Sequence, residues 1–389
     1  MKRLLVIGGG FAGVRAAQVA ASTALAENKP LQITLLTEAD QLTIRPRLYL
    51  ADRASWCVPL RPALEPLGIG LKTGSATSIQ IEDRLVEFDT GSGEASLSYD
   101  ALVIATGSRL NWPDVPGLKE TTLNLDTMDA ASEMIRHIEG LGTDENAASF
   151  VVIGAGFTGL EIATELRSTL ESIHGAERAE QARIFLVDRN AAPSLGSNVE
   201  PVLFEALALA RIETRFGRSV TRAARGYIEL NGGERISAST IIYSGGLEAR
   251  PLATSRSLPR DALGRILTDD FLRAGRAEEI FVAGDAAHAA VDDSGRTALM
   301  SCQHAIPMGH AAGRNAAAHL LGVPLDPYRQ PVYVTCLDLG VAGAVFATGW
   351  DRQPTCKGSQ AKAIKAGINA MIAPPSGSAE AIMDAVLAV

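Results

Sequence analysis

Two glycine-rich segments of the same form are the clearest candidates for chemistry in this 389-residue sequence. Both fit the pattern G-x-G-x-x-G, with glycines at Gly8, Gly10, Gly13, Gly154, Gly156 and Gly159. In such a loop the first glycine permits a tight turn, the second lets a diphosphate approach the backbone, and the third lets the next helix pack closely. The free N–H groups of that helix then favour an anion. Each segment therefore predicts a dinucleotide site.

After each glycine loop the next apolar run of the sequence has an acidic residue at or near its end. Glu38 follows the run at 32–36, and Asp188 ends the run that begins at 184. A carboxylate in this position can accept hydrogen bonds from a ribose diol. Asp188 would repel a 2'-phosphate, whereas the next residue, Arg189, could bind one. On balance we expect a modest preference for NADH over NADPH.

Apolar runs of strand length precede both loops, and helical stretches follow them. The first unit is a strand at 2–7 and a helix from Ala12 to about Ala26, and the second is a strand at 149–153 and a helix at 160–172. A lone glycine pattern is often only a tight turn, but two in the same strand, loop and helix context favour two sites. We predict an α/β protein with two Rossmann-like domains and a small C-terminal α+β region.

Two more segments end in glycines. Thr106 and Gly107 end a buried strand that starts near 99 and that by itself would be only a core strand, and Gly245 ends a similar strand in the second half. Asp285, beside Gly284, is either a turn residue or a ligand of a cofactor hydroxyl, and the two nucleotide motifs favour the ligand. Arg45 and Arg47 lie in an irregular segment at 42–49. This segment is either a solvated loop, or Arg45 or Arg47 lies against the cofactor phosphates or the reactive ring.

Composition narrows the class of protein. The net charge is -8, which would repel a phosphate backbone, so we expect no nucleic-acid partner. We expect no transmembrane segment and no signal peptide, because no apolar run is long enough. The four cysteines lack C-x-x-C or zinc spacing, so we expect no metal site and a cytoplasmic location.

The C-terminal tail carries two expected helices with apolar stripes. The residues of these stripes are Ile364, Ile368, Met371, Ile372, Ile382, Met383, Val386 and Leu387. Such a stripe packs on the body, meets a second subunit in a homodimer or touches a membrane. We favour packing or dimerisation, with peripheral contact on the inner face of a membrane as the alternative.

The order of these motifs resembles the two-dinucleotide-binding-domain flavoproteins, the pyridine nucleotide-disulfide oxidoreductase superfamily. Residues 156–166 look most like the type II NADH:quinone oxidoreductases. The resemblance implies FAD at the first loop, NADH or NADPH at the second, and an NAD(P)H domain inserted into the FAD domain. The implied boundaries are 1–111 with 246–327 for FAD, 112–245 for NAD(P)H, and 328–389 for the C-terminal region.

The same resemblance implies roles for single residues. Thr106 and Gly107 would line the FAD, and Gly245 would lie near the nicotinamide site. Ala76 would border the adenine, and Gln303 and Ala305, at the start of a helix, would face the flavin. Glu161 would act at the flavin edge, positioning nicotinamide or managing a proton of the acceptor. Its alternative role is an ordinary partner of the helix dipole.

The implied reaction passes a hydride from nicotinamide to flavin and then electrons to a quinone. Only Cys57 stands where a disulfide-reductase pair would lie, so a thiol relay is not expected. Two alternatives stay open: a reductase of a ferredoxin-like electron carrier, and an FAD-bearing redox sensor without catalysis.

Overall fold

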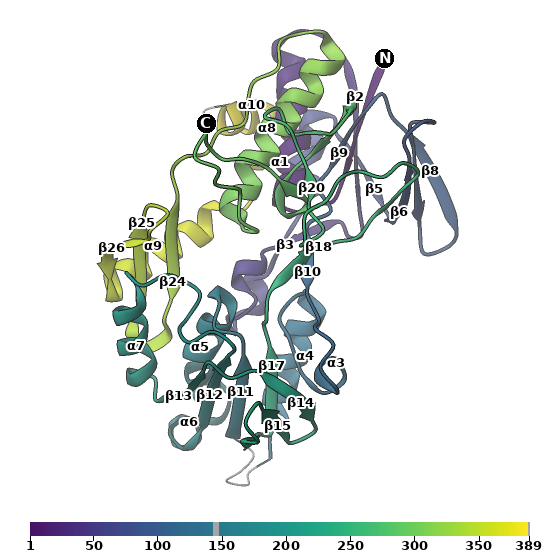
Figure 1. Cartoon of the computed structure of the whole chain (residues 1–389). Coiled ribbons are helices and arrows are strands. Elements are labelled where there is room, and N and C mark those ends of the chain that lie inside the picture. The colour runs from purple at the N-terminus through teal and green to yellow at the C-terminus, as the bar shows by residue number, and fades with distance from the viewer. Residues whose placement is uncertain (143–147, 388–389) are drawn as a thin grey trace.

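A computed structural model of the chain describes residues 1–142 and 148–387. It contains two parallel sheets, each covered by helices, and a smaller C-terminal sheet beside them (Figure 1). The helices are α1 (Phe11–Ala26), α2 (Arg61–Leu64), α3 (Leu118–Thr121), α4 (Met128–Glu139), α5 (Phe157–His174), α6 (Ala176–Gln181), α7 (Glu200–Leu209), α8 (Cys302–Leu321), α9 (Gly358–Met371) and α10 (Ala379–Leu387).

The first sheet has the order β21-β22-β9-β1-β2-β5. Its strands are β1 (Lys2–Ile7), β2 (Leu31–Thr37), β5 (Gly70–Thr73), β9 (Ala101–Ile104), β21 (Arg273–Ala274) and β22 (Ala277–Val282). All pairs are parallel except β21 with β22. The central strands β1, β9 and β22 end in buried apolar residues because both faces of the sheet are covered there. A smaller sheet beside it contains β19 (Ala253–Thr254), β6 (Ser75–Gln80), β7 (Leu85–Asp89) and β8 (Glu94–Ser98).

The second sheet has the order β13-β12-β11-β17 and is parallel throughout. Its strands are β11 (Ser149–Ile153), β12 (Arg183–Asp188), β13 (Ile212–Phe216) and β17 (Thr240–Tyr243). The chain leaves the first body through β10 (Ser108–Leu110) and returns through β18 (Leu247–Ala249), and these two strands pair with each other. The second sheet is thus inserted within the first body, as the sequence predicted, and the α/β class is confirmed.

Short strands complete the structure. An antiparallel sheet that the sequence did not predict lies next to β17 and contains β14 (Val220–Ala224), β15 (Tyr227–Leu230) and β16 (Arg235–Ser237). The C-terminal sheet contains β24 (Val334–Asp338), β25 (Ala344–Thr348) and β26 (Gln353–Lys357), of which β26 was also not predicted. Two further pairs are β3 (Gln41–Thr43) with β4 (Cys57–Pro59), and β20 (Ile266–Leu267) with β23 (Ala287–His288).

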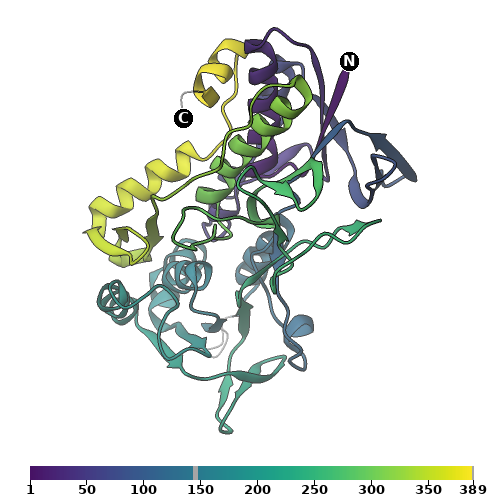
Figure 2. The same ribbon diagram turned by 45° about the horizontal axis from the view of Figure 1, so that its top comes forward.

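Helices α1 and α8 pack with almost no space between their backbones, as Figure 2 shows from a second angle. A Cβ added to Gly309 would lie 2.3 Å from the Ala12 carbonyl oxygen, and one added to Gly313 would lie 2.2 Å from that of Ala16. The glycines of α8 therefore allow this close approach. This contact holds α1, and with it the first glycine loop, against the sheet.

The C-terminal helices pack partly on the body. Ile382 and Val386 of α10 are buried against Val19 of α1, and Ile372 at the end of α9 is buried in the core of the first body. The prediction that the stripes pack on the body is confirmed for these residues. Met371 is 76% exposed, so part of the α9 stripe stays uncovered. Within the described residues, no helix is both long and apolar enough to cross a bilayer.

The contact between α1 and α8 gives a test of the packing. Gly309→Ala should lower the free energy of unfolding by about 1–3 kcal/mol, because the added methyl group forces the two helices apart. Gly367→Ala on α9 is the matched control, since a Cβ there meets nothing within 4 Å. The control should be neutral or stabilising by up to about 1 kcal/mol. Urea unfolding followed by circular dichroism measures both, and equal effects would contradict the packing described.

Candidate functional site

The two glycine loops have the same geometry. Gly8 and Gly154 have φ angles of +109° and +106°, a region that favours glycine. A Cβ at Gly13 or Gly159 would lie 1.8 Å from the carbonyl oxygen of the first glycine of its loop. The middle glycines, Gly10 and Gly156, have nothing within 4 Å of a Cβ. Each loop therefore has open space at the position where a diphosphate would approach.

Both loops also present a helix start without a local competitor. Gly10 is the N-cap of α1 and Gly156 the N-cap of α5, and neither cap makes a side-chain hydrogen bond. No acidic residue lies in the first turn of either helix. The first N–H groups of two helices of 16 and 18 residues are thus available to an anion. This arrangement fits the diphosphate of a dinucleotide at each loop.

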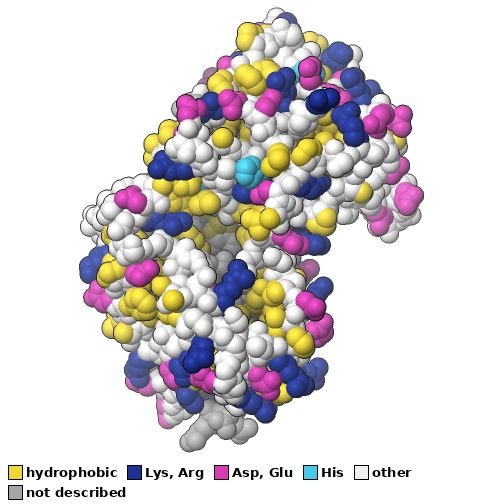
Figure 3. Space-filling model, in the orientation of Figure 1, with side chains coloured by type: hydrophobic (Ala, Val, Ile, Leu, Met, Phe, Trp, Pro, Cys, Tyr) yellow, Lys and Arg dark blue, Asp and Glu magenta, His cyan; other side chains and the backbone are white. Residues whose placement is uncertain are grey.

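One cavity runs past both loops and holds about 1500 Å³. A pocket for a single drug-sized ligand has roughly 300–1,000 Å³, so this cavity has room for more than one. Figure 3 shows hydrophobic side chains around a hollow between the two bodies. The lining includes every predicted site residue except Gly13 and Gly159, which pack inside their loops. The predicted residues that line it are Gly8, Gly10, Glu38, Arg45, Ala76, Thr106, Gly107, Gly154, Gly156, Glu161, Asp188, Gly245, Gly284, Asp285, Gln303 and Ala305.

At the end of β2, Glu38 lies in the position expected of a ribose ligand. Its carboxylate accepts a hydrogen bond from Ser75 Oγ at 3.0 Å and forms an ion pair with Arg250 at 2.8 Å. Burial opposes ionisation, but the hydrogen bond and charge of Arg250 outweigh it, so the pKa of Glu38 is lowered. Glu38 is therefore an ionised acceptor at neutral pH.

A polar network joins the two bodies at Asp285. Ser108 Oγ donates to Asp285 Oδ2 at 2.6 Å, and Arg45 Nη1 donates to the same Ser108 Oγ at 2.9 Å. The Arg45 guanidinium also pairs with Asp126, just before α4 of the second body. Burial raises the pKa of Asp285. Arg45 is thus held in the cavity wall rather than in a solvated loop.

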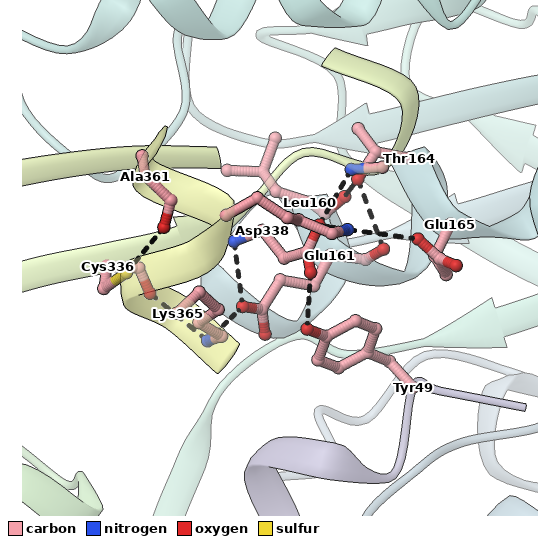
Figure 4. Close-up of polar contacts among 11 residues, drawn as sticks. Tyr49, Leu160, Glu161, Thr164, Glu165, Cys336, Asp338, Ala361 and Lys365 are labelled. Carbon is pink, nitrogen blue, oxygen red and sulfur yellow. Dashed lines mark hydrogen bonds and ion pairs between the residues drawn. The ribbon is translucent and has the colours of Figure 1, made fainter. Parts of the chain in front are cut away.

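Glu161, on the second turn of α5, pairs with a lysine far away in the sequence. Lys365 Nζ of α9 lies 2.7 Å from Glu161 Oε1, and the side chains are only 10% and 7% exposed (Figure 4). The N–H of Asp338 also donates to Glu161 Oε1 at 3.2 Å, and Lys365 Nζ donates to the Cys336 carbonyl oxygen at 3.2 Å. Glu161 is therefore buried and paired, whereas an ordinary helix-dipole partner lies on the surface.

The two charges of this pair affect each other's titration. Burial raises the pKa of Glu161, although Lys365 acts in the opposite direction. Burial alone would lower the pKa of Lys365, but the charge of Glu161 outweighs it and the pKa is raised. The raised pKa of Lys365 therefore depends on the charge of Glu161.

Asp338, whose N–H contacts Glu161, forms a second set of polar contacts through its own carboxylate. Tyr49 Oη donates to Asp338 Oδ2 at 2.9 Å, and Lys362 Nζ lies 2.5 Å from Asp338 Oδ1. Lys362 also approaches Glu165 at 3.9 Å. The network thus runs from the buried Glu161 to the partly exposed Lys362 on one side of α9.

The sequence matches the family model described as pyridine nucleotide-disulphide oxidoreductase over residues 2–309. The chain belongs to this family. An NADH dehydrogenase-like protein of Mycobacterium tuberculosis is 38% identical over 390 residues, covering 98% of this chain and 96% of the relative. A type II NADH:quinone oxidoreductase of Staphylococcus aureus is 24% identical over 368 residues, covering 87% and 88%. The structure of NDH2 from Plasmodium falciparum matches with a TM-score of 0.79 at 13% identity, covering 94% of each chain.

These findings confirm the predicted family and establish the chain as a pyridine nucleotide-disulphide oxidoreductase that is NADH dehydrogenase-like. Despite the family's description, all four cysteines of this member are free. Cys302 and Cys336 line the cavity, and burial raises the pKa of both thiols, that of Cys336 to about 11. Both are protonated at neutral pH and are poor nucleophiles. The structure therefore gives no sign of a thiol relay.

Several residues of the site were not predicted from the sequence. These are Ser108, Asp126, Arg218, Tyr333, Asp338 and Lys365. Lys365 had one local signal, because it and Lys362 are the two cations beside the apolar stripe of α9. The others follow from tertiary contacts between distant segments.

The buried pair leads to a prediction about stability. Lys365→Met should lower the free energy of unfolding by about 3–5 kcal/mol, because Glu161 is left in the interior without its counter-ion. The double variant Glu161→Gln, Lys365→Met should recover most of this loss. Lys357→Met is the matched control, since its pair with Glu205 is 63% and 70% exposed. That change should cost less than about 1 kcal/mol. Urea unfolding at neutral pH measures all three, and a Lys365→Met variant as stable as the control would refute the role of the pair.

Proposed function

We propose that this protein is an FAD-dependent NAD(P)H dehydrogenase that reduces a quinone. The balanced reaction converts NAD(P)H, a proton and a quinone into NAD(P)⁺ and a quinol. The observation that carries the proposal is the single cavity, which passes both glycine loops and ends at an apolar wall supplied by the C-terminal region. The names of the relatives that match most of this chain agree with the nicotinamide and quinone substrates.

The first loop would hold FAD and the second NAD(P)H. Gly8, Gly10 and Gly13 would hold the FAD diphosphate, with Glu38 on the ribose and Asp285 on a hydroxyl of the linker. Ala76, Thr106, Gly107, Gln303 and Ala305 would line the rest of that site. When bound, the flavin supplies the hydride and electron chemistry. The chain itself orients the two nucleotides and excludes water. The division into domains at 111, 245 and 327 is part of this proposal.

The far end of the cavity suits a flat, apolar acceptor. Ile306 of α8 and Ile368 and Ile372 of α9 line it, together with the ring of Tyr333. Aromatic and aliphatic walls with a few polar groups are typical of small-molecule sites. The polar group here is the pair of Lys365 Nζ and Glu161 Oε1, which would place a proton donor beside a quinone carbonyl.

The location of the acceptor site bears on the partners of the protein. Met371, at 76% exposed, lies on the same helix as the cavity-lining Ile368 and Ile372. An uncovered apolar residue next to the acceptor end favours peripheral contact with a membrane that contains the quinone. We keep this contact, and a homodimer through the same region, as proposals.

Reduction and reoxidation of the flavin test the function as a whole. Purified protein reconstituted with FAD should bleach when NADH or NADPH is added without oxygen, and a short-chain quinone should restore its absorbance. Stopped-flow spectroscopy at the flavin band measures both steps. Bleaching followed by reoxidation with a ferredoxin but not with quinone would favour the carrier-reductase alternative. No bleaching would favour a redox sensor and refute the dehydrogenase.

Glu161 gives a sharper test of the acceptor end. Glu161→Gln should lower quinone reduction by about 100-fold, a typical contribution of general acid catalysis, while flavin bleaching stays fast. Since burial raises the pKa of Glu161, its protonated fraction falls as pH rises through that raised value. The wild-type rate of quinone reduction should therefore fall on the alkaline side, and the variant should lose this limb.

Glu165→Gln is the matched control for this change. Glu165 is also on α5, and burial raises its pKa too, but it does not line the cavity. Its variant should keep both the rate and the alkaline limb. The proposed role of Glu161 would be refuted if both variants lost the same amount of quinone-reduction rate. It would also be refuted if Glu161→Gln left both flavin reduction and flavin reoxidation unchanged.

A further inference from the structure

We propose that the nicotinamide donor is NADPH, and that Arg189 and Arg218 bind its 2'-phosphate. This inference rests on the proposed function and specifies the donor of the same site. It reverses the NADH preference expected from Asp188. The argument comes from comparing the chain's two nucleotide sites with each other, residue by residue.

The two sheets share a register that identifies matching positions. Gly8 N donates to the Leu36 carbonyl at 2.8 Å, and Gly154 N donates to the Val187 carbonyl at 2.8 Å. Leu36 of the first site therefore corresponds to Val187 of the second. Two residues further along each strand, Glu38 corresponds to Arg189. A position that is acidic in the first site is basic in the second.

The neighbouring strand gives a second match. Thr37 pairs with Thr73 in the first sheet, and Asp188 pairs with Phe216 in the second. Two residues after these partners come Ser75 in the first site and Arg218 in the second. The matched pairs are therefore Glu38 with Ser75, and Arg189 with Arg218.

The chemistry of the two pairs differs in a way that distinguishes their ligands. Ser75 Oγ donates to Glu38 Oε1 at 3.0 Å, and a carboxylate beside a hydroxyl suits a free ribose diol. Two guanidinium groups suit a phosphate dianion, which each can bind through paired N–H donors. Both arginines are exposed and line the cavity. They stand where the adenosine ribose of the second nucleotide would lie.

Neither arginine has its charge neutralised. Among the residues that the structure describes, neither guanidinium forms an ion pair, and Arg218 Nη1 donates only to the neutral Asn231 carbonyl at 3.3 Å. Several other arginines of this body are paired, as Arg183 is with Glu213 at 3.1 Å and Arg215 with Glu234 at 2.7 Å. Two unpaired cations on one cavity wall are the arrangement expected before an anionic ligand binds.

Asp188 has a different task from the one its position suggested. Its Oδ2 accepts from Ala155 N of the glycine loop at 2.6 Å, and its Oδ1 accepts from Asn190 N at 2.7 Å. The residue is only 9% exposed. Both carboxylate oxygens thus accept hydrogen bonds from the backbone, one from the glycine loop and one from the turn after β12. Asp188 therefore stabilises the loop, and its oxygens are not free to bind the ribose of the nucleotide.

Anaerobic flavin reduction with the two nucleotides tests this inference on the FAD-bound protein. We expect the specificity constant for NADPH to exceed that for NADH by about 10-fold or more, as expected for charged hydrogen bonds to a phosphate. Arg189→Ala and Arg218→Ala should each lower the NADPH constant by about 10- to 100-fold and leave the NADH constant little changed. The NADH reaction of each variant shows that it is folded. Arg222→Ala, an exposed arginine of β14 that does not line the cavity, is the matched control and should change neither constant.

Inhibition by fragments gives an independent reading. Adenosine 2',5'-bisphosphate should have a lower inhibition constant against the donor than 5'-AMP. Raised ionic strength should weaken inhibition by the bisphosphate more than inhibition by 5'-AMP. Both differences should disappear in the two arginine variants. A wild-type preference for NADH, or arginine variants that lose both donors equally, would overturn the inference and leave the dehydrogenase intact. Failure of both nucleotides to reduce the flavin would overturn the proposed function as well.

Discussion

Hydride transfer works only over contact distance, so two nucleotides held by separate loops must bring their reactive ends into the same space. This constraint shapes the whole structure. Each loop follows the carboxyl end of a strand, β1 or β11, and both strand ends open onto one cavity. The second body is inserted through β10 and β18, which pair with each other and tie the two crossings together. The network of Arg45, Ser108, Asp126 and Asp285 fixes the bodies beside that junction.

The C-terminal region also lines the cavity that the two glycine loops share. Lys365 is 204 residues from Glu161, yet the two form a buried ion pair next to apolar side chains of α8 and α9. Burying two charges is costly unless they are paired and hydrogen-bonded, and here the Asp338 N–H and the Cys336 carbonyl complete the bonding. Such a pair is weak evidence for stability alone. Its place on the cavity wall is the reason why we propose a role in handling a proton.

The sequence predicted what depends on neighbouring residues. Both glycine loops, with their strands and helices, could be predicted because spacing and periodicity are local properties. The site positions of Lys365, Asp338 and Arg218 could not be predicted, because each depends on contacts with segments far away in the chain. Asp188 shows the limit at a single residue. Its position at the end of β12 was predicted, but only the structure shows that both carboxylate oxygens already accept backbone N–H groups.

Comparing the two glycine loops and the strands after them distinguishes the features that the two sites share from those in which they differ. Loops of this kind would bind diphosphate through backbone N–H groups, which carry no information about the rest of the nucleotide. Selection would then fall to the side chains just beyond the next two strands, where one site has Glu38 and Ser75 and the other has Arg189 and Arg218. On the proposed function, one backbone design would serve two cofactors through these four side chains.

The central claim is that both nucleotides meet in one cavity. A crystal structure of the FAD-bound protein with oxidised nicotinamide nucleotide would test it most directly. The account predicts the FAD diphosphate at Gly10, the second diphosphate at Gly156, and the nicotinamide ring stacked on the flavin between the two bodies. A nicotinamide that binds outside this cavity, or a flavin that occupies the second loop instead of the first, would contradict the account.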